Sequence, residues 1–264
     1  ATLACAGRLA RIYEDIGNLA ESRRVLEETL AIKQRVYGPD HPDTVWTESE
    51  LGTLLIDMGR FDDAVRILGR CYEVQKAALG ADHYDTVRTQ SNLARCYLMR
   101  GEPGNADAIL LQIQQILEAK YGSDHPDVIS VRWQRVSSLF QQKKFAEAEA
   151  GSAQVLAASE RLYGADHPKT LNVRADYATI ILELGRTQEA IALLERCLAG
   201  AIKVYGPDHP DAVRSKVNLG AAYAQAGNQQ RAADLFREAL VSREKVLGAD
   251  HPDTATTRLN LGVT

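Results

Sequence analysis

The chain contains six histidines, and each lies 42 residues after the one before it. Each histidine stands in a segment related to YGPDHPDT at 37–44, which returns as LGADHYDT at 79–86 and YGSDHPDV at 121–128. Seven of the eight prolines lie in these segments. A fixed period of this length indicates an array of stacked units, because each unit buries its hydrophobic face against a copy of itself. Six such units account for nearly the whole chain. The histidines are His41, His83, His125, His167, His209 and His251.

The unit that starts at residue 205 predicts a first helix from about 211 to 225. Gly206 can end the preceding helix in a left-handed conformation, where a residue without Cβ is not penalised. Asp208 or His209 would then cap the next helix, and Pro210 suits its first turn, because the missing N–H would be unpaired there anyway.

The same unit predicts a second helix after Gly227, with equivalent turn glycines at positions 17, 59, 101 and 185. Its apolar residues follow the i, i+3, i+4, i+7 spacing of one helix face. No segment alternates with period two between hairpin turns, so strands are not expected. The sequence therefore predicts an all-α fold of helix pairs.

The residues that carry a family resemblance are Leu219-Gly220-x-x-Tyr223, followed by Gly227, Ala232, Phe236 and Ala239. This pattern resembles the tetratricopeptide repeat. Its 42-residue period and G-x-D-H-P linker resemble the kinesin light chain type of that repeat. The resemblance implies a right-handed superhelical solenoid of antiparallel helix pairs, in which first helices line a concave groove and second helices form the convex back.

We expect one repeat array over residues 1–264, with units of about 1–36, 37–78, 79–120, 121–162, 163–204 and 205–246 and a partial unit at 247–264. Because the pattern is already under way at residue 1 and is interrupted at residue 264, we expect a fragment of a longer protein.

The unit at 121–162 departs from the pattern at three positions. Arg135 replaces the packing leucine, Lys143 replaces the turn glycine, and Ser152 replaces the large residue of the second helix. Two interpretations stay open, a specialised pocket beside Trp133 and a weak repeat that the array tolerates.

Composition narrows the classes of function. With 31 Lys and Arg against 35 Asp and Glu, the net charge is −4, which gives no general reason to bind nucleic acid or an anionic membrane. No apolar run approaches the roughly 18 residues of a transmembrane helix. The four cysteines lack CxxC spacing, which favours a reducing, cytoplasmic environment.

Neither the histidines nor the cysteines predict a catalytic or metal site. Ligands must converge within about 2 Å of one ion, whereas packed helices lie about 8–10 Å apart, so histidines of successive units cannot share a metal. We interpret each histidine as a capping residue of a repeated loop. Cys71 and Cys197 are predicted to be small core residues, and Cys96 has no partner histidine at a fixed spacing. We therefore expect no enzyme activity and no cofactor.

The surface left after packing is the predicted binding site. On each first helix a stripe at i, i+4, i+7, i+11 lies off the packing face and varies between units, while the packing residues barely vary. Both tryptophans lie on or beside this stripe, and Trp is enriched at interface hot spots. Arginine pairs with carboxylates, and asparagine can pair with an extended peptide backbone. The candidate peptide-binding residues are Arg8, Arg11, Trp46, Glu50, Arg88, Asn92, Arg95, Trp133, Gln134, Asn172, Asp176, Arg214 and Asn218.

The preferred hypothesis is a non-enzymatic interaction scaffold that binds an acidic or mixed-charge protein segment in the groove. Kinesin light chains bind short peptides there, partly through paired asparagines. This chain has the second asparagine of the pair, at Asn92, Asn218 and Asn260, with other residues at the first position. The first alternative is a self-association or sensor arm of a larger regulatory protein. A groove for a small molecule or nucleic acid is disfavoured, because no basic and aromatic residues interleave.

Overall fold

The computed structural model describes residues 3–264, so Ala1 and Thr2, which begin the first predicted unit, lie outside the described residues. Within that range it contains thirteen α-helices and no strand, which confirms the all-α prediction. None of these helices is both long enough and apolar enough to cross a membrane.

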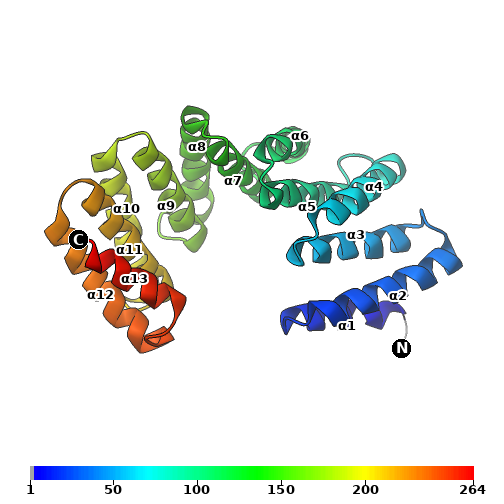
Figure 1. Cartoon of the computed structure of the whole chain (residues 1–264). Coiled ribbons are helices and arrows are strands. Elements are labelled where there is room, and N and C mark those ends of the chain that lie inside the picture. The colour runs from blue at the N-terminus through cyan, green and yellow to red at the C-terminus, as the bar shows by residue number, and fades with distance from the viewer. Residues whose placement is uncertain (1–2) are drawn as a thin grey trace. The chain divides into compact units, whose positions relative to one another are not determined.

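The helices alternate between a first and a second type along the repeats (Figure 1). The first helices are α1 (Leu3–Asp15), α3 (Pro42–Asp57), α5 (Tyr84–Arg100), α7 (Pro126–Gln141), α9 (Pro168–Glu183), α11 (Pro210–Gln225) and α13 (Pro252–Gly262). The second helices are α2 (Leu19–Tyr37), α4 (Phe61–Leu79), α6 (Pro103–Tyr121), α8 (Phe145–Tyr163), α10 (Thr187–Tyr205) and α12 (Gln229–Leu247). The helix expected at about 211–225 is therefore present as α11.

The described residues form two compact units, one that ends at Gln142 and one that runs from Lys143 to Thr264. The first holds α1 to α7 and the second holds α8 to α13. Within each unit every helix packs against the next one along the chain. Each unit has its own buried core, centred on residues such as Leu54 and Leu68 in the first and Ile181 and Leu194 in the second.

The repeated histidine is the N-cap of the first helix that follows it. In all six linkers its Nδ1 accepts a hydrogen bond from the backbone N–H two residues later, at 3.2 or 3.3 Å. In four linkers the ring also stacks on the last tyrosine of the preceding helix, with ring centroids 4.3–4.9 Å apart. The interpretation of these histidines as capping residues is confirmed.

The glycine before each of these linkers has the positive φ that the sequence predicts, although its ψ is extended and not helical. Gly206 has φ 89° and ψ 164°, which combines a glycine-favouring φ with an extended ψ. This conformation turns the chain sharply out of α10, and the linker then enters the cap of α11.

The turn between first and second helices also needs a positive φ. Gly227 meets this need with a φ of 79°, and Lys143, which replaces the glycine in the irregular repeat, is held at 59°. Arg135 is accommodated differently, because its Nε donates a hydrogen bond to Asp107 of α6 at 2.8 Å. Ser152 is buried, at 3% exposure.

Small residues of the repeated pattern let the two helices of a pair approach closely. A Cβ on Gly220 would lie 2.8 Å from the ring of Phe236, and one on Gly52 would lie 2.8 Å from the side chain of Leu68. Carbon atoms cannot approach so closely without displacement. The absence of a side chain at these glycines therefore sets the spacing between the two helices of a pair.

Three cysteines are core residues, as expected for Cys71 and Cys197. Their thiols donate to backbone carbonyls, Cys71 to Val45 at 3.7 Å and Cys197 to Leu171 at 3.5 Å. Cys96 is also buried, whereas Cys5 is exposed. Burial raises the pKa of the Cys197 thiol to about 11, and it raises the pKa of Cys71 further.

Candidate functional site

A pocket of about 510 Å³ opens between α1, α2 and α3 in the first unit. Four of the candidate residues line it, namely Arg8 and Arg11 of α1 and Trp46 and Glu50 of α3. Gly7 of α1 faces the indole, since a Cβ there would lie 3.5 Å from the Trp46 ring, which is ordinary van der Waals contact. The indole remains 37% exposed and forms an apolar wall. We call this the Trp46 pocket.

Two cations lie near the indole of Trp46. The Lys33 ammonium is 5.7 Å and the Arg88 guanidinium 6.0 Å from the ring centroid. Lys33 is buried, and its Nζ donates hydrogen bonds to the Asp43 carbonyl at 3.1 Å and the Thr47 hydroxyl at 2.9 Å. A cation over an indole is attracted by the negative face of the ring, so these contacts hold Trp46 in place.

The two arginines of α1 are available for a ligand. Arg8 and Arg11 are exposed, and neither forms an ion pair or hydrogen bond with the described part of the chain. Glu14, one turn further along α1, accepts a hydrogen bond from the Ser22 hydroxyl at 2.8 Å. Burial raises the pKa of Glu14, and the nearby carboxylates of Glu50 and Asp57 raise it further. The charge of Arg11 acts in the opposite direction on Glu14, but burial has the larger effect. The pocket therefore combines two exposed arginines with a carboxyl group that takes up a proton more readily than usual.

The stripe residues of α5 pair with the equivalent stripe of α3. Arg88 forms an ion pair with Glu50 at 3.0 Å, and Arg95 forms one with Asp57 at 3.3 Å. Between them, the Asn92 amide donates to the Thr53 hydroxyl at 2.9 Å. Arg88, Asn92 and Arg95 thus connect two neighbouring repeats, and their free hydrogen-bonding capacity is smaller than the sequence suggested.

The remaining candidates lie on other first helices. Trp133 and Gln134 lie on α7 and are partly buried. In the second unit, Arg214 of α11 donates a hydrogen bond to the Asn172 amide oxygen of α9 at 2.6 Å. Asp176 is exposed on α9 and Asn218 is half-buried on α11.

Sequence reasoning missed the residues that α2 and the first turn of α3 contribute to the Trp46 pocket. Lys33 comes from α2, and Asp43 comes from the start of α3. The sequence did contain one signal for the ion pairs between neighbouring repeats, namely opposite charges at a constant spacing. The pairs Glu50–Arg88, Asp57–Arg95 and Asp62–Arg100 all join residues 38 positions apart.

The chemistry of the pocket is that of recognition by charge, hydrogen bonds and an aromatic surface. Over residues 3–264, no three His, Cys, Asp or Glu side chains converge as a metal ion would require. Glu14, Arg8 and Arg11 can hold a ligand of mixed charge against the indole of Trp46.

Comparison with protein families gives one matching model, described as tetratricopeptide repeat, over residues 2–77, 46–119, 127–201 and 175–241. These matches cover most of the chain. No curated protein matches it.

Solved structures with the same arrangement of helices include one described as a kinesin light chain with nearly identical TPR-like repeats, from Podosopora anserina. It is 26% identical with a TM-score of 0.70, and the match covers 78% of this chain and 98% of that one. BtubC (BKLC) from P. vanneervenii has a TM-score of 0.74 at 21% identity, over 89% and 94% of the two chains. The apo form of the quorum sensor NprR from B. thuringiensis has a TM-score of 0.73 at 12% identity, over 99% and 69%. The last two likenesses concern the fold alone.

Proposed function

The chain belongs to the tetratricopeptide repeat family, whose arrays are generally non-catalytic protein-interaction scaffolds, and from this premise we propose that it binds an extended peptide segment of a partner protein along its first helices. The Trp46 pocket is the proposed anchor. A scaffold of this class acts through the surface that remains after its helices have packed, and the stripe residues of α1, α3 and α5 form such a surface.

The observation that carries the proposal is the free pair Arg8 and Arg11 beside the exposed face of Trp46. An apolar side chain of the peptide would cover the indole, and acidic side chains would reach the two guanidinium groups. Glu14 and Glu50 lie at the same pocket, so a segment that carries both signs of charge fits better than a purely acidic one.

Affinity capture from host lysate tests the proposal. The wild-type chain is compared with Arg8→Ala/Arg11→Ala and with the control Arg35→Ala/Arg66→Ala, which removes two exposed arginines that do not line the pocket. We expect a protein that the wild type and the control retain and that the pocket variant loses. Equal capture by all three chains would contradict the proposed site.

Fluorescence then locates the bound segment. In a Trp133→Phe variant the emission comes from Trp46 alone, because the chain has two tryptophans. A peptide from the captured partner should shift this emission, since it would remove the indole from water. An unchanged spectrum at saturating peptide would place the binding surface elsewhere.

Self-association is a second candidate. Leu259 on α13 and Val263, the residue that follows this helix, are 71% and 83% exposed, and apolar residues of this kind can pair with a second copy. Light-scattering mass measurement on the wild type and on Leu259→Glu separates the two functions. A dimer that the substitution dissociates would favour self-association.

A further inference from the structure

One position on the first helices is paired with the position 22 residues later, on the second helix. In the repeats where the two side chains touch, their chemistry is complementary. Glu48 forms an ion pair with Arg70, Gln90 donates a hydrogen bond to Gln112 at 3.1 Å, and Lys216 forms an ion pair with Glu238 at 3.3 Å. In the repeat at 163–204 the same two positions hold Arg174 and Arg196. This repeat therefore has two positively charged residues at positions that hold a complementary pair in the three repeats above.

Arg174 is almost fully buried, with a side chain 4% exposed. Its Nη2 donates to the Glu160 carboxylate at 2.7 Å and to the Ala165 carbonyl at 3.1 Å, while its Nε has no hydrogen-bond partner. Arg174 thus already has one opposite charge, from Glu160, as Glu48 has one from Arg70 and Lys216 has one from Glu238. A further cation beside it has no carboxylate of its own, and the two like charges repel each other unless an anion lies between them.

Arg196 is that further cation. It is exposed on α10 and forms no ion pair or hydrogen bond within residues 3–264. Arg174 and Arg196 line one pocket of about 410 Å³ between α8, α9 and α10. Gly200 forms part of its wall, where a Cβ would come within 2.7 Å of Leu171 and 3.2 Å of Asp166.

The charges of this pocket leave one positive charge unmatched. Besides the two arginines it contains Lys203, whose Nζ pairs with Asp166 at 2.6 Å. Glu160 and Asp166 are the carboxylates that line it. Three cations against two anions leave a surplus of one, which a monoanionic ligand would neutralise.

We propose that Arg174 and Arg196 form a binding site for a single carboxylate, supplied by an acidic side chain of a partner protein. A guanidinium pair presents several N–H donors in the geometry that a carboxylate accepts. A dianionic phosphate fits less well, because Glu160 and Asp166 would repel its second charge. Arg174 follows Asn172 by two residues, about 200° around α9, so this site lies on the opposite side of the helix from the stripe residues.

The test is a titration of the ¹⁵N-labelled chain with N-acetyl-tetraglutamate amide at low ionic strength, read from the arginine Nε–Hε resonances. The peptide should shift the resonances of Arg174 and Arg196. In Arg196→Glu the shift at Arg174 should be lost, with at least a tenfold weaker affinity. The control Arg231→Glu makes the same change of charge on α12, away from the pocket, and should bind as the wild type does.

Stability provides an independent readout. In Arg196→Glu the new carboxylate would face Arg174 as Glu238 faces Lys216, so the unfolding midpoint should rise by about 1–2 °C, as expected for one partly exposed ion pair. A lower midpoint would show that the two positions do not face each other, which overturns the proposed site.

Further outcomes of the titration test the ligand and the site separately. Tighter binding of inorganic phosphate than of the peptide would overturn the carboxylate assignment. Equal peptide binding by Arg196→Glu, or no binding by the wild type, would overturn the site itself. The shift at Arg174 should persist in Arg8→Ala/Arg11→Ala, which keeps this result separate from the proposed Trp46 pocket.

Discussion

The guanidinium of Arg88 on α5 lies 3.0 Å from the carboxylate of Glu50 on α3, although 38 residues separate them in the sequence. This pair joins two successive repeats at the edge of the Trp46 pocket. Arg88 also lies over the ring of Trp46 and therefore has two structural roles at a surface proposed to bind a ligand.

Replacing Arg88 with alanine should lower the free energy of unfolding by about 0.5–1 kcal/mol, because the ion pair is partly exposed to solvent. Glu50→Ala should cost a similar amount. A double-mutant cycle by urea unfolding should give a coupling energy of about 0.5 kcal/mol between them. Additive effects would mean that the pair does not contribute to stability.

Adding a methyl group at Gly220 should destabilise the chain by about 1–3 kcal/mol, because the new Cβ would overlap the Phe236 ring. Gly69→Ala is the matched control, since it lies within α4 and nothing stands within 4 Å of its Cβ position. That substitution should stabilise the chain by up to about 1 kcal/mol. Urea unfolding of Gly220→Ala and Gly69→Ala measures both effects. Adding Phe236→Leu to Gly220→Ala should partly restore the stability, because the smaller side chain leaves room for the new Cβ.

Truncating Leu219 to alanine should cost about 2–5 kcal/mol, because this side chain is 2% exposed and packs in the core of the second unit. Leu259→Ala is the comparison, as Leu259 is 71% exposed on α13. Its effect should stay within about 0.5 kcal/mol. A similar loss of stability in both variants, measured by urea unfolding, would contradict the assigned core.

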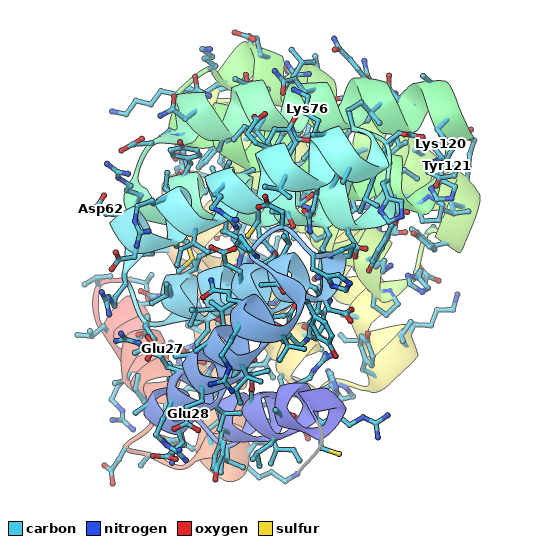
Figure 2. All side chains as sticks on the ribbon, turned by 90° about the vertical axis from the view of Figure 1, so that its right-hand side faces the viewer. Glu27, Glu28, Asp62, Lys76, Lys120 and Tyr121 are labelled. Atoms are coloured by element: carbon cyan, nitrogen blue, oxygen red, sulfur yellow. The ribbon has the colours of Figure 1, made fainter. Side chains whose placement is uncertain are left out.

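Two carboxylates of the linkers, those of Asp82 and Asp166, should make the free energy of unfolding depend on pH in the acidic range. Hydrogen bonds from Lys120 to Asp82 and from Lys203 to Asp166 lower the pKa of each carboxyl (Lys120 is labelled in Figure 2). Since the folded pKa lies below the unfolded one, this stabilisation is complete above the unfolded value of about 3.9 and disappears as pH falls through the folded pKa.

The measurement is the difference in free energy of unfolding between the wild type and Lys120→Met/Lys203→Met. We expect a constant difference from pH 5 to 7 and a decrease toward zero below about pH 4. A difference that grew with acidity would have the wrong sign for lowered carboxyl pKa values. The control Lys76→Met, on an exposed lysine without a linker aspartate, should leave the acid response unchanged.

Cysteine labelling should show one reactive thiol and three unreactive ones in the folded chain. Cys5 is exposed, whereas Cys71, Cys96 and Cys197 are buried and their pKa values are raised by burial. The thiolate is the reactive form, so iodoacetamide at neutral pH should modify Cys5 alone in the folded chain. Mass spectrometry after brief labelling, with a urea-unfolded control, tests this. Labelling of Cys197 at the rate of Cys5 would contradict its buried position.

The sequence by itself determined the repeat, the helix pair and the caps. These features depend on residues within a few positions of one another, as when the His209 ring accepts a hydrogen bond from the N–H of Asp211. Such short-range geometry repeats whenever the local residues repeat. The sequence also determined where residues are small enough to let two helices approach, as Gly220 lets α11 approach Phe236 of α12.

The tertiary structure alone decided which side chains meet across repeats. The free arginines Arg8 and Arg11 and the paired Arg88 occupy related stripe positions, yet their surroundings differ, because a partner is supplied by the neighbouring helix rather than by the residue's own segment. The pocket that Arg174 shares with Arg196 arises in the same way. Contacts between residues 22 or 38 positions apart depend on how helices stack, and stacking is a property of the packed chain.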